Sequence, residues 1–132
     1  MRLACVVLAL LAFAAPAGAA AAAPRLVVER SGGIAGVRDR LVIGPHGAAR
    51  VTHRDGATQR LPAPRTRAVR AALRAARFPT LAAAYRPRRV VNDGFVYDLR
   101  SGGHRVHVEQ GAEGVPRRLQ TLIDTAARLL LA

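Results

Sequence analysis

Apolar residues of this chain recur with two different periods, and the order of those periods constrains the fold more than any other feature. Period-two runs, typical of strands, occupy residues 25–61 and return over residues 95–109. Between and after these two regions, the spacing changes to that of helices. The order of strands, helix, strand hairpin and helix predicts an α+β fold, a small antiparallel β-sheet of four to five strands with two helices packed on one face.

Turn residues divide the first strand-like region. Gly44–Gly47 is a turn by composition, and Asp55-Gly56 suits a tight two-residue hairpin turn. We therefore expect strands over residues 25–30, 37–43 and 48–54, and residues 57–61 can pair back on the third. In the third strand, Ala49 and Val51 are expected to face inward.

Two apolar stripes predict the helices. Pro64 suits the first turn of a helix, where its missing N–H has no partner to lose, and Phe78-Pro79 ends that helix. Pro116 starts the last helix. The expected buried stripes are Ala68, Val69, Ala72, Leu73 and Ala76 in the first helix, and Leu119, Leu122, Ile123, Ala126 and Leu130 in the last.

The first 23 residues have the pattern of a secretory signal peptide. Met1-Arg2 precedes an uncharged apolar run, and Ala17-Gly18-Ala19 offers a cleavage motif. The alternative is a permanent amino-terminal anchor, because the uncharged run is just long enough to span a bilayer. We expect cleavage, which leaves residues 24–132 as one secreted or cell-envelope domain. The only cysteine, Cys5, lies in the signal, so the mature domain has no disulfide.

The charge is strongly basic. The chain has 21 basic residues, all arginine, against eight acids, for a formal net charge of +13. Such a surface attracts polyanions, acidic proteins or anionic membranes. Arg67, Arg70, Arg74 and Arg77 form a stripe along the first predicted helix that suits a phosphate backbone. A basic cell-envelope protein that binds anionic polymers is therefore one function to consider.

Residues for catalysis or metal binding are not arranged as those functions require. Ser31 and Ser101, the only serines, both introduce glycine turns, and the eight acids are scattered. His104 and His107 are three apart on one predicted strand and therefore point to opposite faces. We expect no catalytic residue, no metal site and no cofactor, so the protein is not predicted to be an enzyme.

The glycine-rich stretch over residues 31–36, Ser-Gly-Gly-Ile-Ala-Gly, admits three interpretations. A phosphate cradle requires a helix after the loop, but a strand follows here. A plain bend would fold Ile34 back onto the core. In the third interpretation, Ile34 is an apolar anchor on a slim backbone that enters the pocket of a partner. The residues alone leave the last two open.

The order of motifs resembles the emfourin family, protein inhibitors of thermolysin-like zinc metalloproteases. The resemblance rests on a strand leading into residues 30–36, a following strand, an alanine-rich helix and the stretch Asp93-Gly94-Phe95-Val96-Tyr97. It ends in a Val-Pro start to the last helix and covers nearly everything from Leu26 to Leu130. Many similar sequences carry Phe where this chain has Ile34.

The resemblance implies a secreted, monomeric, non-enzymatic inhibitor that fills the active-site cleft of a thermolysin-like metalloprotease. Such proteases favour a bulky apolar side chain just after the scissile bond, which Ile34 would supply. The implied protease-binding residues are Arg30, Ser31, Gly32, Gly33, Ile34, Ala35, Gly36 and Arg38, in which the two arginines are flanking charges. Asp93 and Gly94 are a second candidate surface. Neither specific nucleic-acid binding nor membrane insertion after cleavage is expected.

Overall fold

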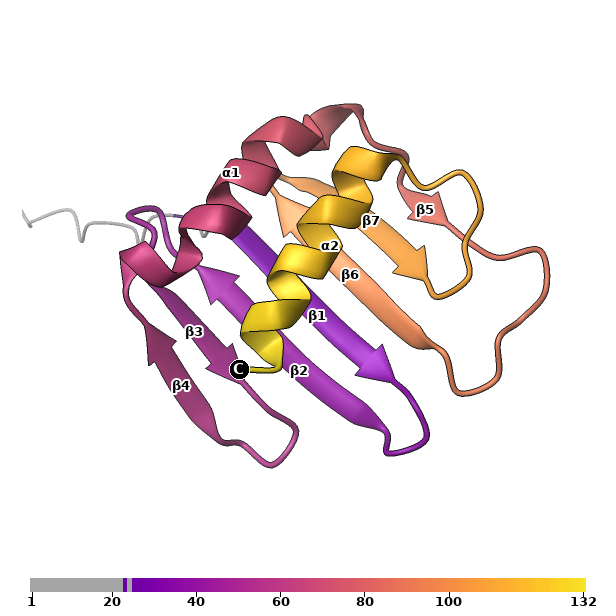
Figure 1. Ribbon diagram of the computed structural model, residues 1–132, viewed down its shortest axis with the longest axis horizontal. Coiled ribbons are helices and arrows are strands. Elements are labelled where there is room, and N and C mark those ends of the chain that lie inside the picture. Colours follow the sequence, from indigo (N-terminus) through magenta and orange to yellow (C-terminus); the bar gives the residue numbers. More distant parts are fainter. Residues whose placement is uncertain (1–22, 24) are drawn as a thin grey trace, which may run out of the picture.

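A computed structural model describes residue 23 and residues 25–132 of the chain, which form a β-sheet with helices on one face (Figure 1). Apart from Ala23, the predicted signal peptide lies outside the described residues. The strands are β1 (Leu26–Gly32), β2 (Val37–Ile43), β3 (Ala49–Thr52), β4 (Thr58–Leu61), β5 (Ala84–Tyr85), β6 (Phe95–Ser101) and β7 (His104–Glu109). The helices are α1 (Arg67–Ala76) and α2 (Arg117–Leu130), and 3-10 turns occupy η1 (Ala63–Thr66) and η2 (Phe78–Thr80).

The sheet has seven strands in the order β4-β3-β2-β1-β6-β7-β5. The predicted α+β class and the two helices on one face are confirmed, whereas the expected strand number of four to five is too low. The expectation of an antiparallel sheet is also wrong at one edge, because β5 pairs with β7 in parallel. Strand β5 has only two residues in an alanine-rich connector without alternation, so the sequence offers no period from which to recognise it.

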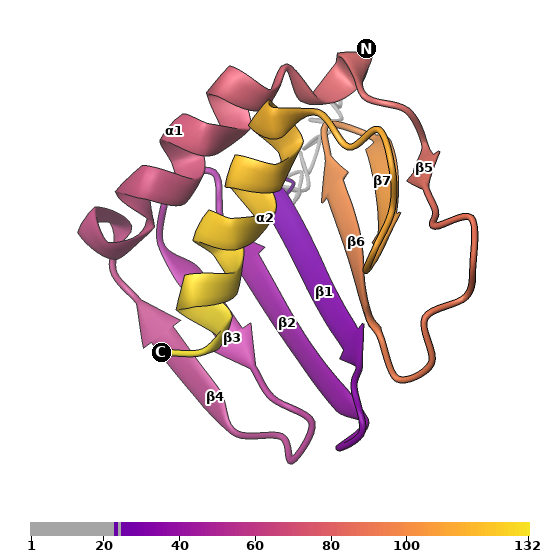
Figure 2. The same cartoon turned by 45° about the vertical axis from the view of Figure 1, so that its right-hand side comes forward.

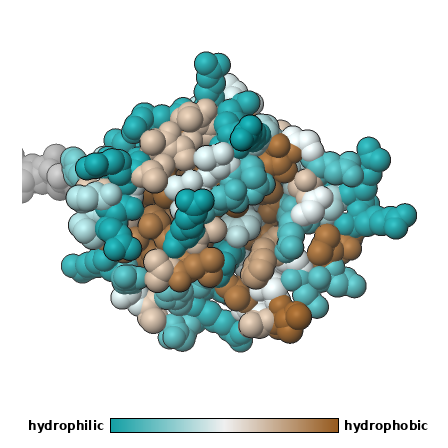
Figure 3. Space-filling view, in the orientation of Figure 1, coloured by the Kyte–Doolittle hydropathy of each residue, from teal (hydrophilic) through white to brown (hydrophobic). Residues whose placement is uncertain are grey.

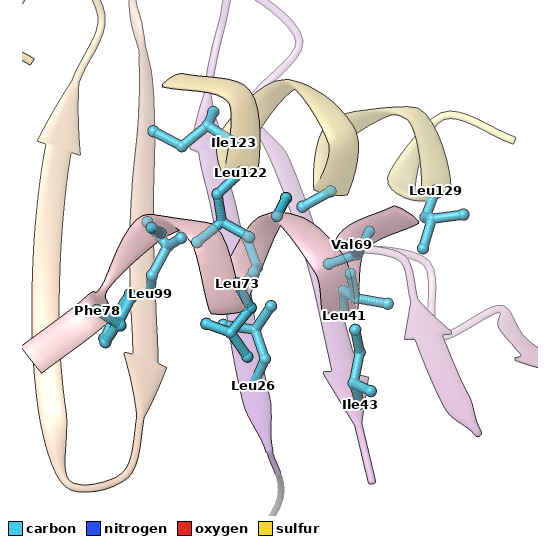
Figure 4. Packing of buried hydrophobic residues seen from close by; sticks show 14 of the residues in the cluster. Leu26, Leu41, Ile43, Val69, Leu73, Phe78, Leu99, Leu122, Ile123 and Leu129 are labelled. Carbon is cyan, nitrogen blue, oxygen red and sulfur yellow. The ribbon is translucent and has the colours of Figure 1, made fainter. Parts of the chain in front are cut away.

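Alternation along the strands places one row of apolar side chains under the helices. Val28 lies opposite Leu41 on β2 and opposite Leu99 on β6, and all three are fully buried. Figure 4 shows Leu26, Leu41 and Ile43 pointing from the sheet toward the helices. Ala49 and Val51 on β3 are buried, as predicted.

The helices cover this row with their own apolar stripes. Val69 and Leu73 of α1 and Leu122 of α2 reach down to the sheet (Figure 4). The stripe predicted for α2 is fully confirmed. In α1, Ala68 is exposed rather than buried, because the sheet-facing side of this short helix is filled by Val69, Ala72, Leu73 and Ala76.

The remaining connections gather at the two ends of the strands. The β1–β2 turn, the β3–β4 turn and the long β5–β6 connection lie at the same end (Figures 1 and 2). The stretch Ser31–Gly36 therefore lies beside Arg54 of the β3–β4 turn and Gly94 of the β5–β6 connection. The sheet face opposite the helices, here named the bare face, carries mostly polar side chains, together with Val27, Val42 and Val96.

His107 lies on the bare face between two carboxylates. Its Nδ1 is 2.7 Å from Oδ1 of Asp98 on β6, and its Nε2 is 3.2 Å from Oε1 of Glu109. The hydrogen bond to Asp98 raises the pKa of His107 above its ordinary value of 6.5; partial burial opposes this, and the bond to Glu109 adds to it. Arg86, beyond β5, also reaches Glu109, at 3.1 Å.

This raised pKa predicts a pH-dependent stability. Protonated His107 binds its partners in the folded state, so its contribution is complete below pH 6.5. The contribution is lost as the pH rises through the raised pKa of the folded state. As the pH rises from 6.5 through this raised pKa, the midpoint of thermal unfolding should therefore fall. The fall should be smaller in His107→Gln. His46→Gln, at an exposed histidine, is the control and should keep the wild-type profile; equal flattening in both variants would refute the assignment.

Candidate functional site

The glycine-rich stretch forms the tip of the β1–β2 hairpin, defined here as residues 33–36. The amide of Gly36 donates to the carbonyl of Gly33 at 3.0 Å, which closes a four-residue turn. Ile34 at the turn is 93% exposed and is the most exposed large apolar side chain among the described residues. The interpretation in which Ile34 folds back onto the core is therefore wrong.

One side of the tip packs backbone against backbone with the β5–β6 connection. The amide of Gly33 donates to the carbonyl of Gly94 at 3.4 Å. A Cβ atom on Gly32 would lie 2.2 Å from that same carbonyl oxygen, and Gly32 has a φ of +105°. Only glycine satisfies both the backbone angle and the close approach at this position. The residues expected as a second surface, Asp93 and Gly94, thus adjoin the tip.

The other side of the tip is held by an arginine that the sequence analysis did not single out. Nη1 of Arg54 donates to the carbonyl oxygens of Ala35 at 2.9 Å and of Gly36 at 3.2 Å. Arg54 precedes the Asp55-Gly56 turn of the neighbouring hairpin, so the β3–β4 turn supports the β1–β2 tip. No sequence pattern reports a side chain that reaches backbone carbonyls 18 and 19 residues away.

A buried charge network lies at the base of the hairpin. Nη2 of Arg30 donates to Oδ2 of Asp39 at 2.6 Å, and Nε of Arg30 donates to the same oxygen at 3.2 Å. Nδ1 of His53 donates to the second carboxylate oxygen at 2.8 Å. The guanidinium of Arg30 also lies 5.2 Å from the ring centroid of Phe95, within cation–π range.

This network changes the role of Arg30. The resemblance implies that Arg30 is a flanking charge available to a partner, but its side chain is only 9% exposed. Alternation explains the burial, because Arg30 shares the helix-facing side of β1 with Leu26 and Val28. Arg30 therefore supports the hairpin from within.

The remaining expected residues stay near the surface. Arg38 is exposed on the bare face, opposite the half-buried Ser31. Val90 in the β5–β6 connection is 86% exposed, and Val91 is 43% exposed. Apolar patches on the helix side are separated by hydrophilic surface (Figure 3). The strand end thus presents isolated apolar side chains among arginines.

A hollow of about 550 Å³ lies behind the tip. Ala35 and Arg54 line it from the hairpin turns, and Leu131 lines it just beyond α2. The buried Arg30–Asp39 pair forms part of its wall. Ile34 does not line this hollow, in agreement with its 93% exposure.

The arginine stripe of α1 is only partly free. Nε of Arg70 donates to Oγ1 of Thr66 at 3.1 Å, and its Nη2 donates to the carbonyl of Ala63 at 3.0 Å. Arg67, Arg74 and Arg77 are exposed. The stripe therefore offers three free side chains rather than the expected four.

Within residues 23 and 25–132, no group of three or more His, Cys, Asp or Glu side chains is placed to hold a metal ion. None of the helices in this part of the chain has the length and apolar character needed to cross a membrane. In comparisons with known proteins, no family model matches the sequence, and no curated protein matches it.

Two glycines separate the effect of close packing from that of backbone strain. Gly32→Ala should lower the free energy of unfolding by about 1–3 kcal/mol more than Gly56→Ala, because only Gly32 faces a backbone carbonyl. Gly56 has a similar φ of +84° and nothing within 4 Å, so its variant measures the strain alone, about 1 kcal/mol. Urea denaturation checks this difference. Equal losses would show that the tip is not packed against the β5–β6 connection.

Removal of the buried carboxylate tests the network at the base. Asp39→Asn should lower the free energy of unfolding by about 3 kcal/mol or more, because it leaves the charge of Arg30 buried without a counter-ion. Glu29→Gln is the matched control, since Glu29 pairs with Arg40 at 3.3 Å on the exposed face. That variant should change stability by less than about 1 kcal/mol. Similar losses in the two variants would contradict this assignment.

Proposed function

We propose that this protein is a secreted, non-enzymatic inhibitor of thermolysin-like zinc metalloproteases that acts by filling the active-site cleft. The observation that carries the proposal is Ile34, which is 93% exposed at the tip of a hairpin held from both sides. An isolated, protruding apolar side chain suits a protease subsite that accepts a bulky apolar residue. The resemblance to the emfourin family supports the same function.

The supports of the tip lower the cost of binding. A flexible loop loses conformational entropy when a partner orders it, whereas a loop already held in one conformation loses little. Arg54 and Gly94 hold the tip through three hydrogen bonds to its backbone. The slim glycine backbone beside Ile34 allows that side chain to enter a narrow cleft.

Inhibition by this route requires no zinc ligand from the tip. Residues 31–36 contain no His, Cys, Asp or Glu. The tip would therefore act by occupying the cleft and excluding substrate and water from the metal. Arg38 and Arg54, exposed beside the tip, would speed the encounter with an acidic enzyme.

Inhibition assays test the proposal directly. Residues 24–132 should inhibit at least one of several thermolysin-type enzymes at micromolar concentration or below. Ile34→Asp should weaken inhibition by about 30-fold or more, because a charge replaces the central apolar contact. Val90→Asp is the matched control, since Val90 is an 86% exposed apolar residue on the adjoining connection.

The outcomes separate the alternatives. No inhibition across the enzymes tested would refute the proposal. Inhibition lost with Val90→Asp but kept with Ile34→Asp would move the contact to the β5–β6 connection. The other function considered is binding of anionic polymers by the α1 stripe. In that case, polymer binding should not change in Ile34→Asp, but it should weaken strongly with added salt and in Arg67→Gln/Arg74→Gln.

A further inference from the structure

The bare face of the sheet is divided by charge. Its three acids, Glu29, Asp98 and Glu109, lie on β1, β6 and β7. The part formed by β2, β3 and β4 has no acid among its outward positions and carries the four arginines Arg38, Arg40, Arg50 and Arg60. Of these four, only Arg40 forms an ion pair within the described residues, with Glu29 at 3.3 Å.

Two of the free arginines face each other. Arg50 on β3 lies directly opposite Arg60 on β4, and both side chains are exposed. Directly opposed residues on one face have Cβ atoms about 5 Å apart, so like charges there destabilise the strand pair. In the described part of the chain, no carboxylate lies within ion-pair distance of either side chain.

A second pair of opposed arginines lies in the same row across the sheet, although one of its members has a counter-ion. Arg100 on β6 is directly opposite Arg105 on β7, and Arg100 forms an ion pair with Glu29 at 3.6 Å. The complete row reads Arg60, Arg50, Val42, Val27, Arg100 and Arg105 from β4 to β7. At about 4.8 Å per strand, this row is roughly 24 Å long. A ligand that contacts both pairs must therefore be an extended chain.

We infer that the bare face binds a linear, phosphate-bearing polymer, with Arg50 and Arg60 as the main contact and Arg100 and Arg105 as the second. Every unit of a phosphate chain carries a negative charge, so neighbouring units can pair with two opposed guanidinium groups at once. Bound phosphate would turn the repulsion between the opposed arginines into shared attraction.

Other partners fit this face less well. Protein interfaces have an apolar core, but the large apolar residues in the arginine row are only Val42, which is half-buried, and Val27, which is 7% exposed. Single-stranded nucleic acids are bound by stacking on aromatic side chains, and β2, β3 and β4 contain none. A phosphate chain without bases requires neither an apolar core nor an aromatic stacking surface.

This inference does not depend on the proposed inhibitor function. The row lies toward the start of β1, whereas the tip with Ile34 follows the end of β1. The two sites therefore occupy opposite ends of the sheet, and one molecule can use both. An inhibitor bound to an anionic polymer through its bare face would still present its tip.

Binding to inorganic polyphosphate of defined chain length tests the inference on residues 24–132. Arg50→Gln/Arg60→Gln should weaken binding by about 10-fold or more at physiological salt and reduce the salt dependence by about two counter-ions. Arg67→Gln/Arg74→Gln removes the same charge from exposed positions on α1 and should weaken binding by less than about threefold. Equal losses of affinity in the two double variants would show that only net charge matters, and the proposed site would be wrong.

A charge reversal adds a readout that general charge cannot imitate. Arg60→Glu would place a carboxylate opposite Arg50, so its unfolding midpoint should rise by about 1–4 °C while polyphosphate binding falls. If the midpoint does not rise, repulsion between Arg50 and Arg60 does not destabilise the strand pair, and the main premise of the inference is wrong. Absence of polyphosphate binding by the wild-type domain, or tighter binding of polyglutamate or of single-stranded DNA, would overturn the assignment of the ligand.

Discussion

The ion pair between Arg30 and Asp39 is the interaction on which the functional end of the molecule depends. Burial of one charge alone costs several kcal/mol, so each of these residues requires the other in this position. The requirement fixes the register of β1 against β2, because Arg30 is directly opposite Asp39 in that register. A slip of β2 by one residue would also turn its apolar row to the wrong face. The hairpin therefore turns at one place, and Ile34 is the residue at its turn.

The same ion pair connects the hairpin to its neighbours. His53 binds Asp39 from the end of β3, and Phe95 at the start of β6 lies against the guanidinium of Arg30. Both neighbours lead directly into the segments that support the tip, since Arg54 follows His53 and Gly94 precedes Phe95. A rigid tip is therefore a property of four adjacent strands rather than of the glycine-rich stretch alone. A short glycine loop without these contacts would be flexible and would lose more entropy on binding.

Periodicity predicts most of this fold and little of the site. The strands and helices with strong apolar periods are where the sequence placed them, since burial of one face requires that pattern. Strand β5 was missed because two residues have no period. The even spacing of Arg30 from Leu26 and Val28 indicates that it shares their buried face. A charged residue is rarely buried without a partner, however, and the sequence does not reveal one. Whether Ile34 points inward or outward depends on contacts from Arg54 and Gly94, which no local pattern reveals.

The arginines of the bare face also go beyond what the fold requires. Alternation demands polar residues on a face that the helices leave uncovered, and small residues such as Thr52 and Thr58 meet that demand on the same strands. Arginine opposite arginine, as at Arg50 and Arg60, instead costs stability in a marginally stable domain. The acids of the bare face lie on β1, β6 and β7, so Glu29 offsets part of the cost at Arg100 but no acid offsets it at Arg50 and Arg60. A feature that weakens the sheet without a compensating contact is better explained by a ligand than by folding.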